Sequence, residues 1–299
     1  MQTLVGHISQ YISTLLQTTT RRPLFVGLQG PQGSGKTYTS RLLQNHLSSP
    51  PLHLRAAVLS IDDLYLPHAG LRSLAEANPG NSLLRGRGQP GTHDIDLGLH
   101  VLAALKDGQS NIELPRFDKS LHNGEGDRLP MDGSGVIIRQ PPCLDVIILE
   151  GWFVGFFPIM AEEIERRWRE HWVKESSLLG ICELAGLNDI VQINEKLRSY
   201  VKMWDYIDTL VQLVSNSELS HENPSQYSII YKWRLEQEHY MKANNGGVGM
   251  SDDAVKMFVD RYIPGYVFFG DTNTNANWTG KGLKILLDKN REMVGSITF

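Results

Sequence analysis

The sequence has 299 residues, of which 41% are hydrophobic, so the chain can bury a sizeable core in one large domain or two smaller ones. Its formal net charge of −4 argues against the global basic field typical of proteins that bind nucleic acid or membrane surfaces. No apolar run approaches the roughly 20 residues of a membrane span. Two cysteines do not make a disulfide framework, and with scattered histidines they offer no zinc constellation.

The first 22 residues predict a helix, because Leu4, Ile8, Ile12 and Leu15 recur at helical spacing. The same segment is poor in acids and rich in Ser and Thr, which is also typical of organellar transit peptides. We favour an ordinary first helix in a cytoplasmic protein, with nuclear entry left open and a transit peptide as the alternative.

Apolar runs typical of buried strands alternate with helical patterns along the rest of the chain. The strands are expected at 24–29, 55–61, 145–149, 207–214 and, more weakly, 283–287. The helices are expected at 36–48, 94–106, 188–204, 226–242 and 251–262. This alternation predicts an α/β fold with a parallel sheet of about five strands and helices on both faces. We expect one domain over 1–299, with insertions at 65–93, 115–135 and 159–206 that form substrate and lid regions.

The stretch LFVGLQGPQGSGKTYTSRLL carries the pattern G-x-x-x-x-G-K-[ST] between a predicted strand and a predicted helix. Its glycines let backbone N–H groups turn inward around phosphate oxygens, and the helix N-terminus adds its positive dipole end. Lys36 is expected to reach the β- and γ-phosphates, and Thr37 to bind Mg²⁺. The residues expected to bind the nucleotide are Gly30, Pro31, Gln32, Gly33, Ser34, Gly35, Lys36, Thr37 and Tyr38.

An acid closes the predicted strand DVIILEG at Glu150. A carboxylate in that position would lie beside the phosphate-binding loop and hold Mg²⁺, through water or directly. The alternative is a strand-end acid that faces solvent.

Two adjacent carboxylates, Asp62 and Asp63, follow the second predicted strand in SIDDLYL. Phosphoryl transfer to an alcohol needs a base that accepts the hydroxyl proton late, and one carboxylate can serve. Successive residues of a strand point in opposite directions, so the two acids cannot serve equally, and either one of them is expected to orient the loop instead. Both acids could otherwise simply cap a turn.

Cationic side chains gather in LPRFDKSLHNGEGDR, where they could bind a substrate anion or belong to a solvated mixed-charge loop. His93 could contact substrate or be structural. Arg234 could act on the transferring phosphate as a lid residue, or pair with Glu238 one turn later on its helix. The residues expected to bind the acceptor are Asp63, Tyr65, His93, Arg116, Lys119 and Arg128.

Together these motifs resemble the D-glycerate 3-kinase group of P-loop kinases, which includes plant glycerate kinase and fungal ATP-binding relatives. The resemblance covers most of the chain: GPQGSGKT, SIDDLYL, RGQPGTHD, LPRFDKS with GEGDR, ILEGWFVGF and YKWRLEQEHYMK stand in the family's order. It implies ATP with Mg²⁺ and transfer to the hydroxyl of a small molecule. It also implies that Asp62 is the base, although Leu64 replaces an aromatic residue common in that element.

The leading hypothesis is an ATP-dependent kinase that converts D-glycerate to 3-phosphoglycerate, with Lys36, Asp62 and Arg234 as its catalytic residues. The alternatives are a kinase for a pantothenate- or nucleoside-like alcohol, and a regulator that binds ATP without turnover. We expect a small-molecule substrate, and no nucleic-acid, membrane or obligate protein partner.

Overall fold

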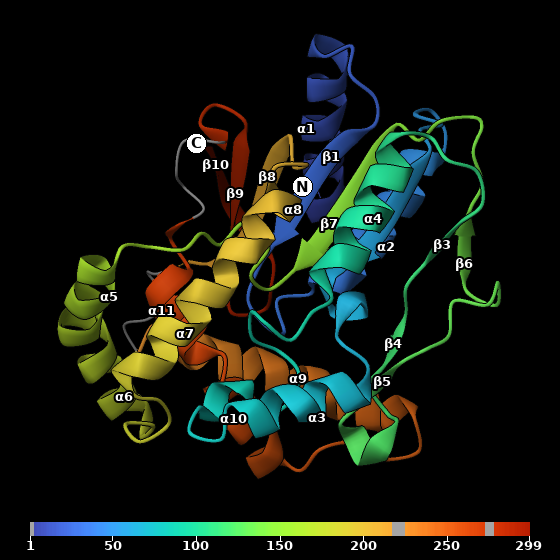
Figure 1. Ribbon diagram of the computed structural model, residues 1–299. Helices are drawn as coiled ribbons and strands as arrows, with labels where there is room; N and C mark the ends of the chain where they lie inside the picture. Colours follow the sequence, from blue (N-terminus) through green and yellow to red (C-terminus); the bar gives the residue numbers. More distant parts are fainter. Residues whose placement is uncertain (1–2, 217–224, 273–277) are drawn as a thin grey trace.

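The structure, a computed structural model, describes residues 3–216, 225–272 and 278–299. A six-stranded sheet crosses its centre in the order β10-β9-β8-β1-β7-β2 (Figure 1). These strands are β1 (Leu24–Gln29), β2 (Ala56–Ser60), β7 (Val146–Gly151), β8 (Thr209–Ser215), β9 (Gly282–Leu287) and β10 (Met293–Thr298). Two small ribbons pair β3 (Ile112–Leu114) with β6 (Val136–Ile138) and β4 (Phe117–Asp118) with β5 (Asp127–Arg128).

Five strands of the central sheet are parallel, so the predicted fold class is confirmed. β1 lies between β7 and β8, and every residue of β1 and β7 is buried, as their continuous apolar runs predict. The sixth strand, β10, pairs antiparallel with β9 at the edge. The sequence analysis missed β10, because an exposed edge strand carries neither an apolar run nor a full alternation.

The helices are α1 (Leu4–Thr18), α2 (Lys36–Ser48), α3 (His68–Ala77), α4 (Ile95–Lys106), α5 (Ala161–Arg167), α6 (Val173–Leu179), α7 (Leu187–Leu197), α8 (Val201–Trp204), α9 (Ser228–Asn244), α10 (Asp252–Asp260) and α11 (Ile263–Phe269). The structure matches the bounds predicted for α2 and those for α4, α9 and α10 to within two residues. The helix expected at 188–204 is divided into α7 and α8 by a short 3₁₀ turn, η5 (Arg198–Tyr200).

One face of the sheet packs against α1 and α2. Ile8, Ile12 and Leu16 of α1 are buried beside Leu43 and Leu47 of α2, in a cluster that includes apolar side chains of β1, β7, β8 and β9. The first helix therefore belongs to the core, as its apolar spacing predicts.

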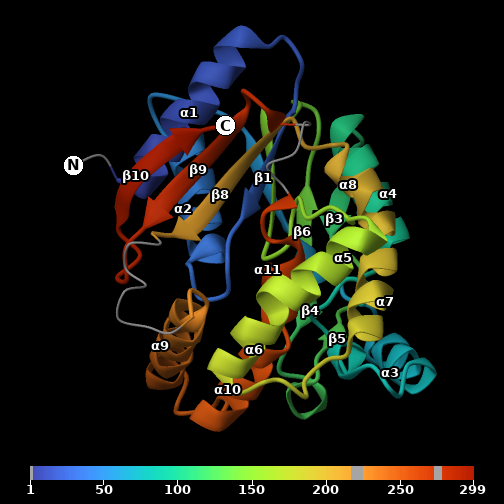
Figure 2. The same ribbon diagram turned by 90° about the vertical axis from the view of Figure 1, so that its left-hand side faces the viewer.

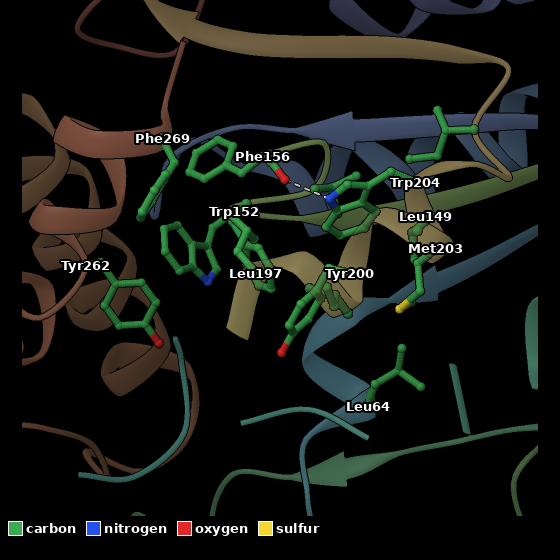
Figure 3. Packing of buried hydrophobic residues seen from close by; sticks show 14 of the residues in the cluster. Leu64, Leu149, Trp152, Phe156, Leu197, Tyr200, Met203, Trp204, Tyr262 and Phe269 are labelled. Carbon is green, nitrogen blue, oxygen red and sulfur yellow. Dashed lines mark hydrogen bonds between the residues drawn. The ribbon is translucent and has the colours of Figure 1, made fainter. Parts of the chain in front are cut away.

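The opposite face packs against α4, α7 and α8, which lie together to the right of the sheet in Figure 2. Large aromatic side chains dominate this core (Figure 3). The indole N–H of Trp204 donates to the carbonyl of Phe156 at 2.8 Å, so this buried polar group is satisfied.

The inserted segments, expected to be helices and loops, contain several short helices. Segment 65–93 holds α3, and segment 159–187 holds α5 and α6 joined by a π-helical turn, η4 (Trp168–Trp172). α3, α9 and α10 lie beyond the carboxyl ends of the parallel strands, at the bottom of Figure 1, together with the β4–β5 ribbon. This is the edge at which open α/β sheets bind ligands.

None of the described helices is long and apolar enough to cross a membrane.

The burial of α1 gives a stability prediction. Ile12→Ala should lower the free energy of unfolding by about 2–5 kcal/mol, because it removes a fully buried side chain from a packed core. Chemical denaturation measures this loss, and Gln17→Ala, on the exposed side of the same helix, is the matched control. Equal effects of the two substitutions would show that α1 is not part of the cooperative core.

Candidate active site

The phosphate-binding loop spans residues 30–35, between the end of β1 and the start of α2. Gly35 precedes α2 at a φ of 87°, a left-handed conformation that favours glycine, and a Cβ there would meet no atom within 4 Å. The first N–H groups of α2 have no carbonyl before them in the helix. The loop thus offers orphan donors next to open space, which suits a phosphate group.

Neighbouring elements hold the back of this loop. Gly33 has a φ of 73°, and a Cβ there would lie 2.4 Å from the carbonyl carbon of Trp233 in α9. Arg291, in the turn between β9 and β10, donates from Nε to the Gly33 carbonyl at 2.6 Å and from a terminal nitrogen to the Trp233 carbonyl at 2.9 Å. The hydroxyl of Tyr266 accepts the Gln32 N–H at 3.1 Å. The loop is therefore shaped before any nucleotide arrives.

Lys36 and Thr37 open α2 and face the acid at the end of β7. Thr37 Oγ1 donates to Glu150 Oε1 at 2.9 Å, and Lys36 Nζ donates to the Pro31 carbonyl at 3.0 Å. Burial raises the pKa of Glu150, although the Lys36 ammonium opposes that change. Burial likewise lowers the pKa of Lys36, against the pull of Glu150 and Asp62. The alternative of a solvent-facing Glu150 is wrong, since the residue is 2% exposed.

The Thr37 hydroxyl and the Glu150 carboxylate together fit Mg²⁺. A hydroxyl and a carboxylate are hard oxygen donors, and Mg²⁺ in kinase sites takes one or two protein ligands beside phosphate oxygens and water. No group of three or more His, Cys, Asp or Glu side chains in described positions could hold a metal on its own. The donor set therefore favours a magnesium ion that is completed by a nucleotide.

Asp62 lies on a 3₁₀ turn, η1 (Ile61–Leu64), directly after β2. Its Oδ2 accepts from Lys119 Nζ at 2.6 Å, and its Oδ1 accepts from the Tyr65 hydroxyl at 3.1 Å. Burial would raise the pKa of Asp62, but the Lys119 ammonium and other cations lower it to about 2. Ser60, two residues before Asp62, pairs with Glu150 across β2 and β7, and Asp62 influences the pKa of both Glu150 and Lys36. Asp62 and the phosphate-binding loop therefore lie at the same edge of the sheet.

Asp63 faces a different partner. Its Oδ1 accepts the backbone N–H of Phe117 at 3.0 Å, which fixes the start of the β4–β5 ribbon. Burial raises the pKa of Asp63 to about 6, with a contribution from the nearby Asp62 charge. The two acids lie on a 3₁₀ turn rather than on a strand, yet they diverge as the sequence analysis expects.

His93 is buried behind Tyr65 and Asp62. Its ring stacks on Tyr65 at a centroid distance of 4.3 Å, and Nδ1 lies 2.8 Å from the Tyr200 hydroxyl. That hydroxyl already accepts the Gly91 N–H, so its hydrogen is free to donate to Nδ1, and the His93 proton then lies on Nε2. Nε2 is buried without a hydrogen-bond partner among the described residues, and burial lowers the pKa of His93 to about 3. Tyr200 carries no local motif, so sequence reasoning did not find it.

The other cations of segment 114–128 have internal partners. Arg128 forms an ion pair with Asp94 at 2.9 Å and donates to the Tyr65 carbonyl from two nitrogens. Arg116 donates to Ser134 at 2.9 Å in the loop between the ribbons. Only Lys119 of the three predicted cations contacts Asp62.

Within the described part of the chain, Arg234 and Tyr38 form no hydrogen bond or ion pair with Asp62 or Glu150, although the backbone of Arg234 packs against Gly33. Arg234 forms an ion pair with Glu238 at 2.8 Å, and their side chains are only 11% and 2% exposed. This is the local alternative of the sequence analysis, and a lid role for Arg234 stays a prediction. Tyr38 points away from the core on the first turn of α2, with its side chain 70% exposed.

The fold and the loop at its centre define a P-loop protein, and comparison with known proteins narrows that class. The chain is 34% identical to the probable ATP-dependent kinase TDA10 of Saccharomyces cerevisiae, over 98% of this chain and 94% of the relative. A solved structure of D-glycerate 3-kinase from Cryptococcus neoformans var. grubii matches with a TM-score of 0.86 and 36% identity, over 99% of both chains. The chloroplastic D-glycerate 3-kinase of Arabidopsis thaliana is 34% identical over 82% of this chain but 47% of the plant protein.

The chain belongs to the D-glycerate 3-kinase group of P-loop kinases, as its motifs predict. It is a kinase, and the alcohol-directed phosphotransferase chemistry expected from its sequence is supported by these relatives. No general model of a protein family matches the chain.

The two acids of η1 generate a prediction about pH. The raised pKa of Asp63 means that folding favours its protonated form, so this contribution to stability is complete below pH 4 and is lost as the pH rises through about 6. The free energy of unfolding gained by Asp63→Asn, relative to wild type, should therefore be larger at pH 7 than at pH 4, by up to about 3 kcal/mol. Chemical denaturation at pH 4, 5, 6 and 7 measures the difference. A difference that does not change with pH would contradict the assignment.

Proposed function

We propose that this kinase transfers the γ-phosphoryl group of ATP to a hydroxyl of a small anionic acceptor, with D-glycerate and 3-phosphoglycerate as the leading substrate and product. One observation carries the proposal: Asp62 lies at the same edge of the sheet as the phosphate-binding loop and Glu150, and its carboxylate accepts from the Lys119 ammonium. The cleft thus combines a phosphate-binding loop with a base and a cation. The names of the relatives from Cryptococcus neoformans and Arabidopsis thaliana favour glycerate over other alcohols.

The residues of the loop position the nucleotide. The backbone N–H groups of residues 33–37 surround its phosphates, and Lys36 balances the charge that builds up on the migrating group. Thr37 and Glu150 would hold Mg²⁺, which neutralises charge on the β- and γ-phosphates when it is bound. Desolvation lowers the pKa of Lys36, while the Glu150 and Asp62 carboxylates favour its charged form.

Asp62 acts as the base for the acceptor. The acceptor oxygen forms its bond to the γ-phosphorus as the bond from that phosphorus to the bridging oxygen breaks, and ADP leaves. The hydroxyl proton passes to Asp62 late in this step, as the attacking oxygen loses electron density. With a pKa of about 2, Asp62 is ionised throughout the neutral range and can accept the proton once bond formation has made the hydroxyl acidic.

Three further side chains define the acceptor side of the cleft. Tyr65 and Lys119 fix the two oxygens of Asp62. His93 offers its unpartnered Nε2–H as a donor to an acceptor oxygen. Asp63 and Arg128 act indirectly, because they hold the backbone of Phe117 and Tyr65.

An acceptor panel tests the proposed substrate. ATP consumption should be stimulated by D-glycerate well above a blank without acceptor, and more than by pantothenate, uridine or glycerol. Appearance of 3-phosphoglycerate confirms the product. Turnover of another alcohol with none of glycerate would remove glycerate from the proposal while leaving the kinase assignment intact.

Substitution of the base tests the mechanism. Asp62→Asn should lower kcat by about 100-fold or more, because the amide cannot accept the proton, whereas the affinity for ATP should change little. Asp63→Asn is the matched control, since its amide oxygen can still accept from Phe117 and it should retain most of the activity. Equal losses in the two variants would assign the effect to the shape of η1 rather than to a base.

A further inference from the structure

A pocket of about 640 Å³ opens beyond the carboxyl edge of the sheet, between α3, the segment after η2 (Ser82–Leu84), the loop after η3 (His122–Gly124) and α10 with the residue that follows it. The sequence analysis assigned none of the residues that line it. Four of them are arginines: Arg72, Arg85, Arg87 and Arg261. An arginine-rich pocket points to an anionic ligand, because the guanidinium fork matches carboxylate and phosphate oxygens.

Two of these arginines, Arg87 and Arg261, have no acidic partner within the described ranges. Arg87 donates to the carbonyls of Gly124 and Glu125 at 2.6 and 2.5 Å, and Arg261 donates to the Arg87 carbonyl at 2.9 Å. The Nε of Arg261 is buried and makes no hydrogen bond to a described residue. Backbone carbonyls orient these guanidinium groups without neutralising them.

The other charges in the pocket are accounted for differently. Arg72 lies 3.6 Å from Glu76 on the same helix, and Arg85 is exposed. Glu125, the acid of the pocket lining, lies 2.5 Å from His68. Glu125 therefore contacts His68, and no described acid forms an ion pair with Arg87 or Arg261.

Electrostatics show the consequence of this arrangement. Burial lowers the pKa of Arg261, and the nearby Arg87 charge lowers it further. A partly buried cation beside a second cation is unfavourable unless an anion offsets their charge. Proteins retain such a pair where a ligand supplies the missing charge.

Two packed aromatic rings, Phe117 and Tyr65, connect Arg87 with the proposed base. The guanidinium carbon of Arg87 lies 5.9 Å from the centre of the Phe117 ring, and that ring packs edge-on against Tyr65 at 5.2 Å. Tyr65 in turn donates to Asp62. Asp62 and Arg87 both influence the pKa of Tyr65 and of Tyr262, so the two charges lie near the same pair of phenol groups.

Aromatic side chains next to Arg261 fix the position of the arginine pair. Tyr262 follows Arg261 and packs on Gly88, where a Cβ would lie 2.4 Å from its hydroxyl oxygen. Trp152 packs edge-on against Tyr262 and donates to the Gly88 carbonyl at 3.1 Å. Packed aromatic side chains therefore support the arginine pair, and a fixed pair of guanidinium groups suits selective recognition of a ligand.

We propose that Arg87 and Arg261 bind the carboxylate of the acceptor and so place its hydroxyl at Asp62. This inference rests on the proposed kinase reaction and names the groups that make the enzyme select a hydroxy acid over a neutral alcohol.

The test compares D-glycerate with glyceramide, which has the same hydroxyls but no charge, in wild type, Arg87→Gln and Arg261→Gln. Each substitution should raise the KM for D-glycerate by roughly 10- to 100-fold, the size of a lost charge-assisted hydrogen bond. It should leave the KM for ATP and kcat/KM for glyceramide within about threefold of wild type. Arg198→Gln, an exposed arginine that pairs with Glu195 at 2.8 Å, is the control and should change neither.

Arg87→Lys and Arg261→Lys are used in case a Gln variant does not fold. They keep the positive charge and lose only the two-pronged contact. Each should fall between wild type and its Gln variant in KM for D-glycerate. Equal losses with D-glycerate and glyceramide, or no loss with either, would overturn the inference and leave the kinase reaction standing.

A binding measurement separates this inference from the choice of substrate. D-glycerate should raise the melting temperature of wild type, and this increase should be absent in Arg87→Gln and Arg261→Gln. If wild type binds D-glycerate through this pair but does not phosphorylate it, the proposed substrate is wrong and the carboxylate site stands. If wild type shows no stabilisation by D-glycerate, or the Gln variants are stabilised as much, the carboxylate site is refuted.

Discussion

The parallel pairing of β1, β7 and β2 is the constraint on which the rest of the structure depends. Because the strands run in one direction, their carboxyl ends meet at one edge, and Leu28, Glu150 and Ser60 lie at matching register positions. The phosphate-binding loop, the buried acid and the carboxylates of η1 therefore arise from segments far apart in sequence and still face one cleft. Everything proposed about the chemistry follows from that coincidence of strand ends.

Charge balance within this cleft is a second organising principle. Lys36 and Lys119 are matched against Glu150, Asp62 and Asp63, all at least partly removed from water. The acids do not behave alike, because Asp62 has an ammonium partner whereas Asp63 has only a backbone N–H. The two neighbouring aspartates thus have separate roles: Asp62 is the proposed base, and Asp63 holds the backbone of the β4–β5 ribbon.

Features encoded by local pattern could be predicted from the sequence. The loop of residues 30–35, helix α2 and the position of Glu150 follow from short-range spacing, and all five parallel strands were expected close to their observed places. Contacts that depend on distant segments could not be predicted. Tyr200 reaches His93 from another helix, and Arg261 meets Arg87 only because α10 packs beside the segment after η2. Arg128 shows the reverse case, since a cation in a suggestive loop proves to have Asp94 as its partner.

Arg291 joins the turn between β9 and β10 to helix α9 and to the phosphate-binding loop. From the β9–β10 turn it holds the carbonyl of Gly33, its guanidinium carbon lies 5.7 Å from the centre of the Trp233 ring, and it pairs with Glu236 at 2.8 Å. One side chain thus connects both the β9–β10 hairpin and α9 to the phosphate-binding loop. Local opening of the β9–β10 edge would therefore lower the affinity for ATP before it affected the pairing of the central strands.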